Sequence, residues 1–322
     1  MVYETVSSII SQLVFNKNLA LGNEGFQRFL KDATEGPKYF AISGLMVFFP
    51  LLKKIPPFSW VHQETKRRER EFLQLLQDQI DDHKRTRDPN AARDFIDCFL
   101  NELDNSDTLE RSEELGYPDN QLIGVARDLF LGGSDTTSNS ICWAVLYLSR
   151  NQDAQAKMYA EISDIVGQMA PSTTMSDKMP YTKAVIQEIL RMRPIAPLSL
   201  GHLSCREDTI MGYRIPKGTL IAANIFGIQN NEATWPDPDK FDPCRHIDSD
   251  GKFAKSTNMI PFSIGARQCL GMQLANMELF LIIVSLFQKY KFDFAGNVNM
   301  DMRGKNIFNL KSYPFKVIAS NR

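Results

Sequence analysis

The sequence is poor in cysteine, and its few cysteines are widely spaced. It has five in 322 residues, and even the two nearest in sequence, Cys244 and Cys269, are far apart. No CxxC pair and no paired Cys/His spacing occurs, which excludes a zinc finger and a disulfide-dense secreted scaffold. Because the number of cysteines is odd, at least one of them is unpaired.

Neither sign of charge dominates, and no hydrophobic run is long. Lys+Arg 37 balance Asp+Glu 38, so the net charge of −1 gives no general attraction to nucleic acid. The longest apolar stretch, residues 41–52, includes Ser43, Gly44 and Pro50, and a spanning helix needs about 20 apolar residues. The N-terminus does not have the pattern of a signal peptide. With 43% hydrophobic residues, the chain is expected to be globular with a large core, not disordered, collagen-like or membrane-spanning.

Other familiar motifs are missing as well. The sequence has no GxSxG, HExxH or GxxxxGK(S/T) motif, and no GxGxxG follows a predicted strand. The basic run Lys66–Arg70 includes Glu69 and lies on a predicted helix. We interpret it as a solvated helix face in preference to an RNA-binding patch.

Helical periodicity dominates roughly the first 200 residues. The spacing of apolar residues predicts helices over residues 2–14, 23–34, 61–87, 94–103, 120–148, 153–166 and 181–192. After Pro194 the pattern predicts short strands within 195–221, irregular structure over 230–246, an apolar helix over 269–289, and strands at 291–295 and 315–319. We expect a mainly α (α+β) protein forming a single domain, 1–322, with residues 1–200 rich in helix and 201–322 carrying small sheets.

The segment Phe262–Gly271 carries the most specific pattern. Cys269 is predicted at the N-terminal edge of the apolar helix, where the helix dipole, loop N–H groups and a cationic neighbour favour a thiolate. Gly265 permits a tight turn, Gly271 lets a flat ligand approach the backbone, and Arg267 can face an anion. Taken alone, a cysteine such as Cys269 is more often a buried structural residue than a ligand.

A second unusual segment, Gly132–Thr137, lies in the middle of the long predicted helix. Each glycine costs about 1 kcal/mol relative to alanine inside a helix, and Ser, Asp and Thr compete for its backbone hydrogen bonds. The glycines form either a packing notch for another helix or a widened turn beside a cofactor.

Glu188 and Arg191, three residues apart, share a face of the helix over 181–192. An isolated pair of this kind is usually a solvated surface bridge. His62 and His83 are expected on solvated helix faces, and His202 lies near a predicted strand, where a histidine is more often structural than a ligand.

Together these segments resemble the cytochrome P450 superfamily, most closely its animal microsomal family-2 branch. Phe262, Gly265, Arg267, Cys269 and Gly271 match the haem-thiolate signature FxxGxRxCxG. The resemblance implies that Cys269 is the axial ligand of the iron in haem b (heme b), and that Arg267 pairs with a haem propionate.

The resemblance also gives roles to the other segments. Gly132–Thr136 matches the motif (Ala/Gly)-Gly-x-(Asp/Glu)-Thr, which implies that Thr136 hydrogen-bonds oxygen at the iron and that Asp135 helps to relay protons. Glu188, Arg191 and Arg245 match a buried architectural network. His202 matches a propionate contact, whereas His246 stands where the family usually has Phe and is given no role.

Residues in the family's substrate-contact regions are less specific, because ordinary core packing explains them equally well. They are Leu129, Phe130, Gly132, Gly133, Ile195, Ala196, Leu198, Ile307 and Phe308. The segments Phe48–Leu52 and Pro56–Trp60 match a family loop that dips into the membrane surface, and here too core packing is an alternative.

The resemblance implies a haem-thiolate monooxygenase that inserts one atom of O₂ into an apolar small molecule, either a xenobiotic or a fatty-acid-like or steroid-like compound. Electrons would come from NADPH through NADPH-cytochrome P450 reductase, with cytochrome b5 as a further partner. The implied location is the cytoplasmic face of the endoplasmic reticulum membrane, with no nucleic-acid partner.

The resemblance begins near the family's helix E, so we expect a chain that lacks the N-terminal third of the fold and its anchor. If this is the true form, it is expected to be cytoplasmic. Two alternatives remain open: a haem-binding or degenerate protein without turnover, and a thiolate-haem isomerase or dehydratase of oxygenated lipids. Asp135 and Thr136 argue against the isomerase, and NADPH consumption coupled to product distinguishes the monooxygenase from both.

Overall fold

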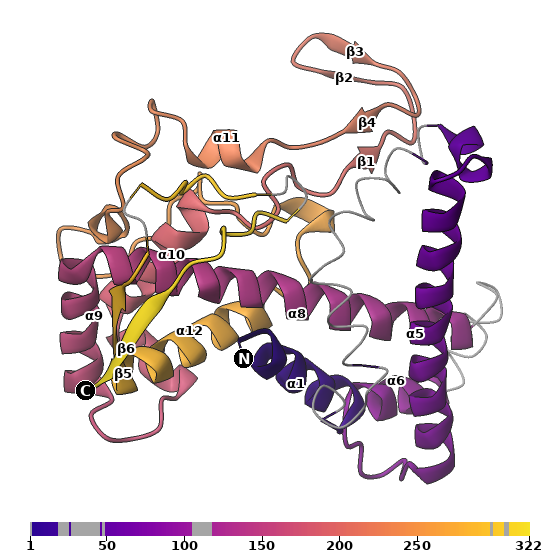
Figure 1. Ribbon diagram of the computed structural model, residues 1–322, viewed down its shortest axis with the longest axis horizontal. Coiled ribbons are helices and arrows are strands. Elements are labelled where there is room, and N and C mark those ends of the chain that lie inside the picture. The colour runs from indigo at the N-terminus through magenta and orange to yellow at the C-terminus, as the bar shows by residue number, and fades with distance from the viewer. Residues whose placement is uncertain are drawn as a thin grey trace. The chain divides into compact units, whose positions relative to one another are not determined.

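A computed structural model describes residues 2–18, 26, 46, 49–104, 118–296, 299–305 and 309–322, with the backbone alone for 118–120. The chain divides into two compact units, Met1–Asp135 and Thr136–Arg322. The long helix α8 (Pro118–Arg150) runs from the first unit into the second (Figure 1).

The described residues of the first unit form helices connected by turns and loops. Besides the first part of α8 it has α1 (Val2–Phe15), the short 3₁₀ helix η1 (Pro50–Lys54), α5 (Phe58–Thr86) and α6 (Phe95–Leu103). The Asp94 carboxylate caps α6 by accepting a hydrogen bond from the Asp97 N–H at 2.9 Å. The predicted helix over 23–34 lies outside the described residues apart from Phe26, which is helical.

Aromatic packing forms part of the core of this unit. On α5, Phe72 and Leu76 are one helical turn apart and both are buried. The ring of Phe72 packs with those of Phe26 and Phe130, and the Phe26 and Phe130 centroids are 4.6 Å apart. Ring pairs in this arrangement add stability beyond the area that they bury.

The solvated position expected for His83 is wrong. The side chain of His83 is buried, with Nε2 2.6 Å from Asp94 Oδ2 and Nδ1 2.7 Å from the Gln79 carbonyl oxygen. Residue 83 is polar in type and lies on a mostly polar helix, so the periodicity of α5 alone gave no sign that α6 covers it.

The second unit combines helices with three two-stranded antiparallel sheets. Its helices are the rest of α8, α9 (Gln152–Ile165), η2 (Thr173–Lys178), α10 (Pro180–Met192), α11 (Ile225–Gln229), η3 (Pro243–His246), η4 (Gly265–Arg267) and α12 (Met272–Lys289). Its strands are β1 (His202–Leu203), β2 (Asp208–Ile210), β3 (Tyr213–Ile215), β4 (Leu220–Ile221), β5 (Tyr290–Phe294) and β6 (Val317–Asn321).

The strands pair as β1–β4, β2–β3 and β5–β6. Met211 and Gly212 both have positive φ and connect the paired residues Ile210 and Tyr213, as a two-residue hairpin turn requires. The hairpin extends beyond the β1–β4 pair, and β5–β6 is a twisted ribbon beside α9 and α12 (Figure 1). The observed elements confirm the mainly α fold with small sheets.

Helix α10 is packed against α9, α11, α12 and η3. Pro180 opens it, a position where a missing N–H costs nothing. The Glu161 carboxylate of α9 accepts from the Tyr181 and Thr182 N–H groups at 2.9 and 2.7 Å. These contacts fix the helix that carries Glu188 and Arg191.

Candidate active site

Cys269 lies in an exposed loop that precedes α12. Its N–H donates to the Phe262 carbonyl at 2.9 Å, which closes the loop. Gly265 has φ +79°, a conformation that a residue with a side chain adopts only under strain. The helix was expected to begin at Cys269 but begins at Met272, because the loop continues through Gly271, the residue that caps the helix.

The loop has the chemistry that a flat, iron-bearing group requires. The thiol of Cys269 is exposed. In the part of the chain that the structure describes, a Cβ added to Gly271 would meet only the Cys269 Sγ, at 4.0 Å. Gly271 therefore leaves space beside the sulfur for a planar ring system, and the residues present fit a haem.

Arg267 and His202 are also exposed, in the same loop and on β1 respectively. Neither forms a salt bridge with a carboxylate among the described residues, so both are available to an anionic group such as a propionate. Phe262 is half-buried at the start of the loop.

The segment Gly132–Thr137 lies within an uninterrupted α-helix, α8. A Cβ on Gly133 would come within 2.7 Å of the Ile10 Cδ1, whereas one on Gly132 would meet nothing within 4 Å among the described residues. Gly133 is therefore a packing notch for α1. Asp135 and Thr136 are half-buried neighbours on this helix.

Glu188 is at the centre of a buried ionic network. Arg191 Nε donates to Glu188 Oε2 at 2.8 Å and Arg191 Nη2 donates to Oε1 at 3.0 Å, a two-pronged contact in which both side chains have no exposed surface. The Asp242 N–H donates to Oε1 at 3.1 Å. Burial acts to raise the pKa of Glu188, but the hydrogen bonds from His246 and Arg191 hold it below its ordinary value.

His246 belongs to this network, although no role was predicted for it. Its Nε2 is 3.0 Å from Glu188 Oε2 and its side chain is fully buried. The expected partner, Arg245, has its Nε at 3.5 Å from Glu188 Oε1, while its Nη2 donates to the Asp237 carbonyl at 2.8 Å. The shorter third side-chain contact to Glu188 is therefore made by His246.

Gln229 is a second residue that the sequence did not single out. It is buried at the end of α11, and its carbonyl accepts from Arg191 Nη1 at 2.9 Å. A lone glutamine followed by two asparagines has no motif around it. Only the three-dimensional contacts reveal its position between α10 and the cysteine loop.

The residues of the predicted substrate-contact regions differ in their burial. Phe130 and Ile195 are buried, as ordinary core packing requires. Leu129 and Ala196 are half-buried, whereas Leu198 is exposed. Ile307 and Phe308 lie outside the described residues.

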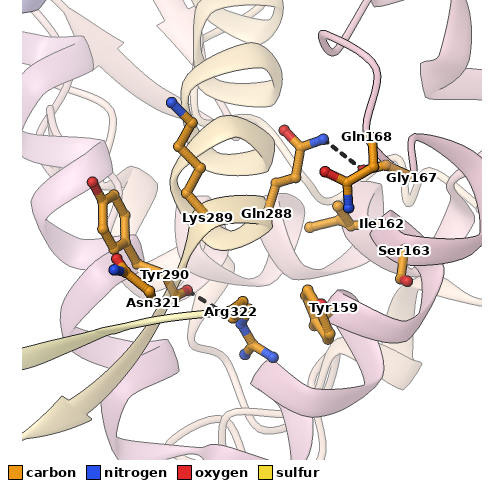
Figure 2. Close-up of a pocket in the computed structure, with 10 residues that line it drawn as sticks. All are labelled: Tyr159, Ile162, Ser163, Gly167, Gln168, Gln288, Lys289, Tyr290, Asn321 and Arg322. Carbon is orange, nitrogen blue, oxygen red and sulfur yellow. Dashed lines mark hydrogen bonds between the residues drawn. The ribbon is translucent and has the colours of Figure 1, made fainter.

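A cavity of about 420 Å³ lies elsewhere in the second unit. Figure 2 shows its lining, which comes from α9 and the loop after it, the end of α12, the start of β5 and the C-terminal residues, and includes none of the predicted site residues. The Arg322 guanidinium stacks on the Tyr159 ring at 3.7 Å and donates to the Tyr290 carbonyl at 3.3 Å. The Arg322 guanidinium thus serves local packing.

An exposed apolar segment, residues 49–60, includes η1 and the start of α5. Phe49, Leu51, Ile55 and Trp60 are each more than half exposed, and Lys53 and Lys54 are exposed beside them. Core packing therefore does not account for these four side chains within the described residues. In that same part of the chain, no helix combines the length and apolar character needed to cross a bilayer.

Comparison with known proteins gives a consistent result. The sequence model of the family described as Cytochrome P450 matches residues 1–319. Cytochrome P450 2U1 of Rattus norvegicus is 35% identical over 98% of this chain and 60% of its own length. Human cytochrome P450 2J2 is 34% identical over 92% of the chain and 59% of its own length, and human cytochrome P450 2D6 is 33% identical over 99% and 64%. The chain spans about three fifths of these relatives.

Proposed function

The chain belongs to the cytochrome P450 family, and we propose from that premise that it is a haem-thiolate monooxygenase acting on apolar small molecules. The observation that carries the proposal is the exposed Cys269 thiol on a loop that keeps all five fixed positions of the haem-thiolate signature. Bound haem b activates O₂, and the cysteine thiolate favours cleavage of the O–O bond.

In this proposal the loop residues hold the haem. Cys269 gives up its proton and supplies the thiolate sulfur, while Gly265 and Gly271 leave space for the ring. Arg267 pairs with a propionate and His202 contacts one, because each is exposed and forms no salt bridge within the described residues. The buried ionic network around Glu188 fixes the part of the protein that lies behind the loop.

Asp135 and Thr136 transfer protons in this proposal. The Thr136 hydroxyl can donate a proton and then accept a second one. The Asp135 carboxyl group can carry that second proton from solvent to Thr136, because both side chains are half-buried and not enclosed in the core. The helix fixes both residues on its surface. This contribution is typically about 10²–10⁴ in rate.

The substrate class is assigned by the family resemblance: an apolar molecule such as a xenobiotic, a fatty acid or a steroid-like compound. Among the residues of the family's substrate-contact regions, Leu129 in the first unit and Ala196 and Leu198 in the second are apolar and at least partly exposed. We propose NADPH-cytochrome P450 reductase as the electron donor and cytochrome b5 as an accessory partner. The apolar segment around Trp60 would then contact the cytoplasmic face of the endoplasmic reticulum membrane.

A reduced carbon-monoxide spectrum of the purified chain tests the haem assignment. Wild type is expected to give the thiolate–iron spectrum, Cys269→Ala to lose it, and Cys205→Ala, which removes another exposed cysteine, to keep it. Retention of the thiolate spectrum in Cys269→Ala would overturn the ligand assignment. Haem binding without NADPH-dependent product would instead identify a haem-binding protein without turnover.

The proton role has its own test. Thr136→Ala is expected to keep the haem and to continue NADPH consumption, with less product and more hydrogen peroxide for each NADPH used. Thr136→Ser retains a hydroxyl and is expected to restore the coupling. Equal coupling in the wild type and in Thr136→Ala would contradict the proposed role.

A further inference from the structure

Gln229 makes a complete set of hydrogen bonds in the core of the second unit. Its side-chain Nε2 donates to the Leu190 and Arg191 carbonyls at 3.0 and 3.1 Å, and its Oε1 accepts from the Ile260 N–H at 3.0 Å. The side chain has no exposed surface. The amide thus satisfies two carbonyls at the end of α10, which no further helical turn can reach, and one loop N–H.

The ion pair of α10 binds the backbone of this glutamine. Arg191 Nη1 donates to the Gln229 carbonyl at 2.9 Å, and the same guanidinium is bound to Glu188. Gln229 is therefore fixed through both its backbone and its side chain. A hydrogen-bond chain leads from His246 through Glu188, Arg191 and Gln229 to Ile260.

Ile260 is at the base of the cysteine loop. Its carbonyl accepts from the Ser263 N–H at 3.0 Å, and Phe262 closes the loop onto Cys269 at 2.9 Å. From Ile264 to Leu270 every residue is exposed. Since this stretch has little packing of its own, its position depends on the backbone contacts at its base.

We propose that Gln229 is a positioning residue that couples the Glu188–Arg191 ion pair to the loop carrying Cys269. The inference rests on the proposed function in one respect, namely that Cys269 is the residue whose position matters. A primary amide suits this place, because it offers two N–H donors for two carbonyls and one oxygen for the Ile260 N–H. Methionine has a similar shape and can replace none of these bonds well.

The chain itself offers a matched control. Gln155 on α9 is also buried, and its Nε2 donates to the Leu148 and Phe292 carbonyls at 2.9 and 2.8 Å while its Oε1 accepts from the Phe292 N–H at 2.9 Å. Both glutamines thus bridge two carbonyls and one N–H, and Gln155 connects α8 and α9 to β5. Its Oε1 also accepts from Arg322 Nη2 at 3.3 Å. Gln155→Met therefore removes at least as many hydrogen bonds as Gln229→Met without touching the base of the cysteine loop.

The first measurement is amide hydrogen exchange in the purified chain, read at Ile260. Wild type is expected to protect this amide. Gln229→Met is expected to raise its exchange rate about tenfold or more relative to Gln155→Met, because a buried N–H loses its acceptor. An unprotected Ile260 amide in the wild type overturns the proposal even if neither variant can be purified.

The second measurement is the share of bound haem that gives the thiolate–iron spectrum. Gln229→Met is expected to lower this share severalfold, and Gln155→Met to leave it near the wild-type value. Equal shares in the two variants overturn the coupling. Absence of the thiolate spectrum from the wild type rejects the proposed function instead, and the hydrogen-exchange result then still decides whether Gln229 anchors the loop.

Discussion

His83 faces hydrogen-bond acceptors with both ring nitrogens. The Gln79 carbonyl oxygen lies 2.7 Å from Nδ1, and a carboxylate oxygen of Asp94 lies 2.6 Å from Nε2. A neutral imidazole can donate from only one nitrogen, so the geometry favours the doubly protonated ring. Burial acts to lower the pKa of His83, but the hydrogen bonds with Asp94 and Gln79 raise it above its ordinary value.

This arrangement predicts a pH-dependent contribution to stability. Because the pKa of His83 is raised in the folded state, its stabilisation is fully present below about 6.5, the ordinary value, and is lost as the pH rises through the folded value. His83→Gln is therefore expected to lower the free energy of unfolding by about 1–3 kcal/mol at pH 6 and by less at pH 9. Urea unfolding at several pH values measures the difference.

Several charged groups surround His83, and a second histidine on the same helix provides a control. Asp97 and Arg93 lie beside Asp94, with Arg93 Nε 2.6 Å from Asp97 Oδ2, and Asp82 also faces the histidine electrostatically. His62 lies on the same helix and is only half-buried, so His62→Gln serves as the control. An equal loss of stability at both pH values in His83→Gln would contradict the charged ring.

Glu278 on α12 is an unusual buried acid. Its side chain is almost fully buried, and neither carboxylate oxygen makes a hydrogen bond of normal geometry within the described part of the chain. Burial raises the pKa of Glu278 to about 7, and the nearby Thr137 hydroxyl offsets only part of that rise. The folded protein therefore binds this proton more tightly than the unfolded chain does.

Stability should consequently fall as the pH rises from about 4.5 to about 7, by at most about 3 kcal/mol from this residue. Glu278→Gln removes the ionisation, so it is expected to raise the free energy of unfolding at pH 8 and to change it little at pH 5. Denaturant unfolding at the two pH values measures both effects. A variant that is less stable than wild type at pH 8 would show that the carboxylate has a partner that offsets its burial.

At the residue scale the sequence was informative only where a motif fixed several positions at once. The spacing from Phe262 to Gly271 singled out Cys269, and Glu188 and Arg191 do form the predicted buried pair. His246 and Gln229 could not be found in this way. Each is defined by a partner that lies tens of residues away in sequence, and neither residue type has a preferred spacing from that partner.

Among the elements, α8 provides a direct comparison of two adjacent glycines. Among the described residues, a Cβ on Gly132 would meet nothing within 4 Å, whereas one on Gly133 would lie 2.7 Å from the buried Ile10 side chain. Replacing a helical glycine by alanine gains about 0.5–1 kcal/mol where the methyl group fits. Overpacking a buried side chain costs about 1–3 kcal/mol.

Gly132→Ala is therefore expected to stabilise the chain by up to about 1 kcal/mol, since it gains helix propensity alone. Gly133→Ala is expected to be neutral or destabilising, because the gain is offset by the clash with Ile10. The free energies of unfolding of the two variants measure the difference. If both alanines stabilise equally, the contact between Gly133 and α1 does not limit the packing of α8.

The periodicity of apolar residues predicted the long helices well and placed the two C-terminal strands within two residues of β5 and β6, but it missed the shortest helices. Observed helices such as α5 and α9 begin and end within a few residues of the predicted bounds. Helix α11 was missed because five residues give too little periodicity to detect. The start of α12 was placed three residues early, since the apolar pattern gives no sign that the loop continues through Gly271.

For the whole molecule, the sequence predicted the fold class and the family, but not which apolar side chains remain exposed. Phe49, Leu51, Ile55 and Trp60 are as apolar as core residues, so composition alone leaves membrane contact and core packing equally open. Their exposure decides against core packing within the described residues. Trp60 is 66% exposed, whereas Trp143 and Trp235 are at most 5% exposed.

This difference makes tryptophan emission a specific probe of membrane contact. Vesicles that contain an anionic lipid are expected to shift the emission of the purified chain to shorter wavelength, because Trp60 enters a less polar environment while the other two tryptophans are already buried. Lys53 and Lys54 lie beside the apolar side chains and add electrostatic attraction, typically about 1 kcal/mol for each lysine near an anionic surface. Titration with vesicles at low salt measures the affinity.

Two variants separate the apolar and electrostatic contributions. Trp60→Phe is expected to abolish the shift while retaining most of the binding in a sedimentation assay, because phenylalanine keeps the apolar contact. Lys53→Gln combined with Lys54→Gln is expected to weaken binding at low salt about tenfold or more and to lose most of that effect at high salt, where surface charges are screened. An emission shift that persists in Trp60→Phe would mean that vesicles change the environment of Trp143 or Trp235, and the segment would then not be the membrane contact.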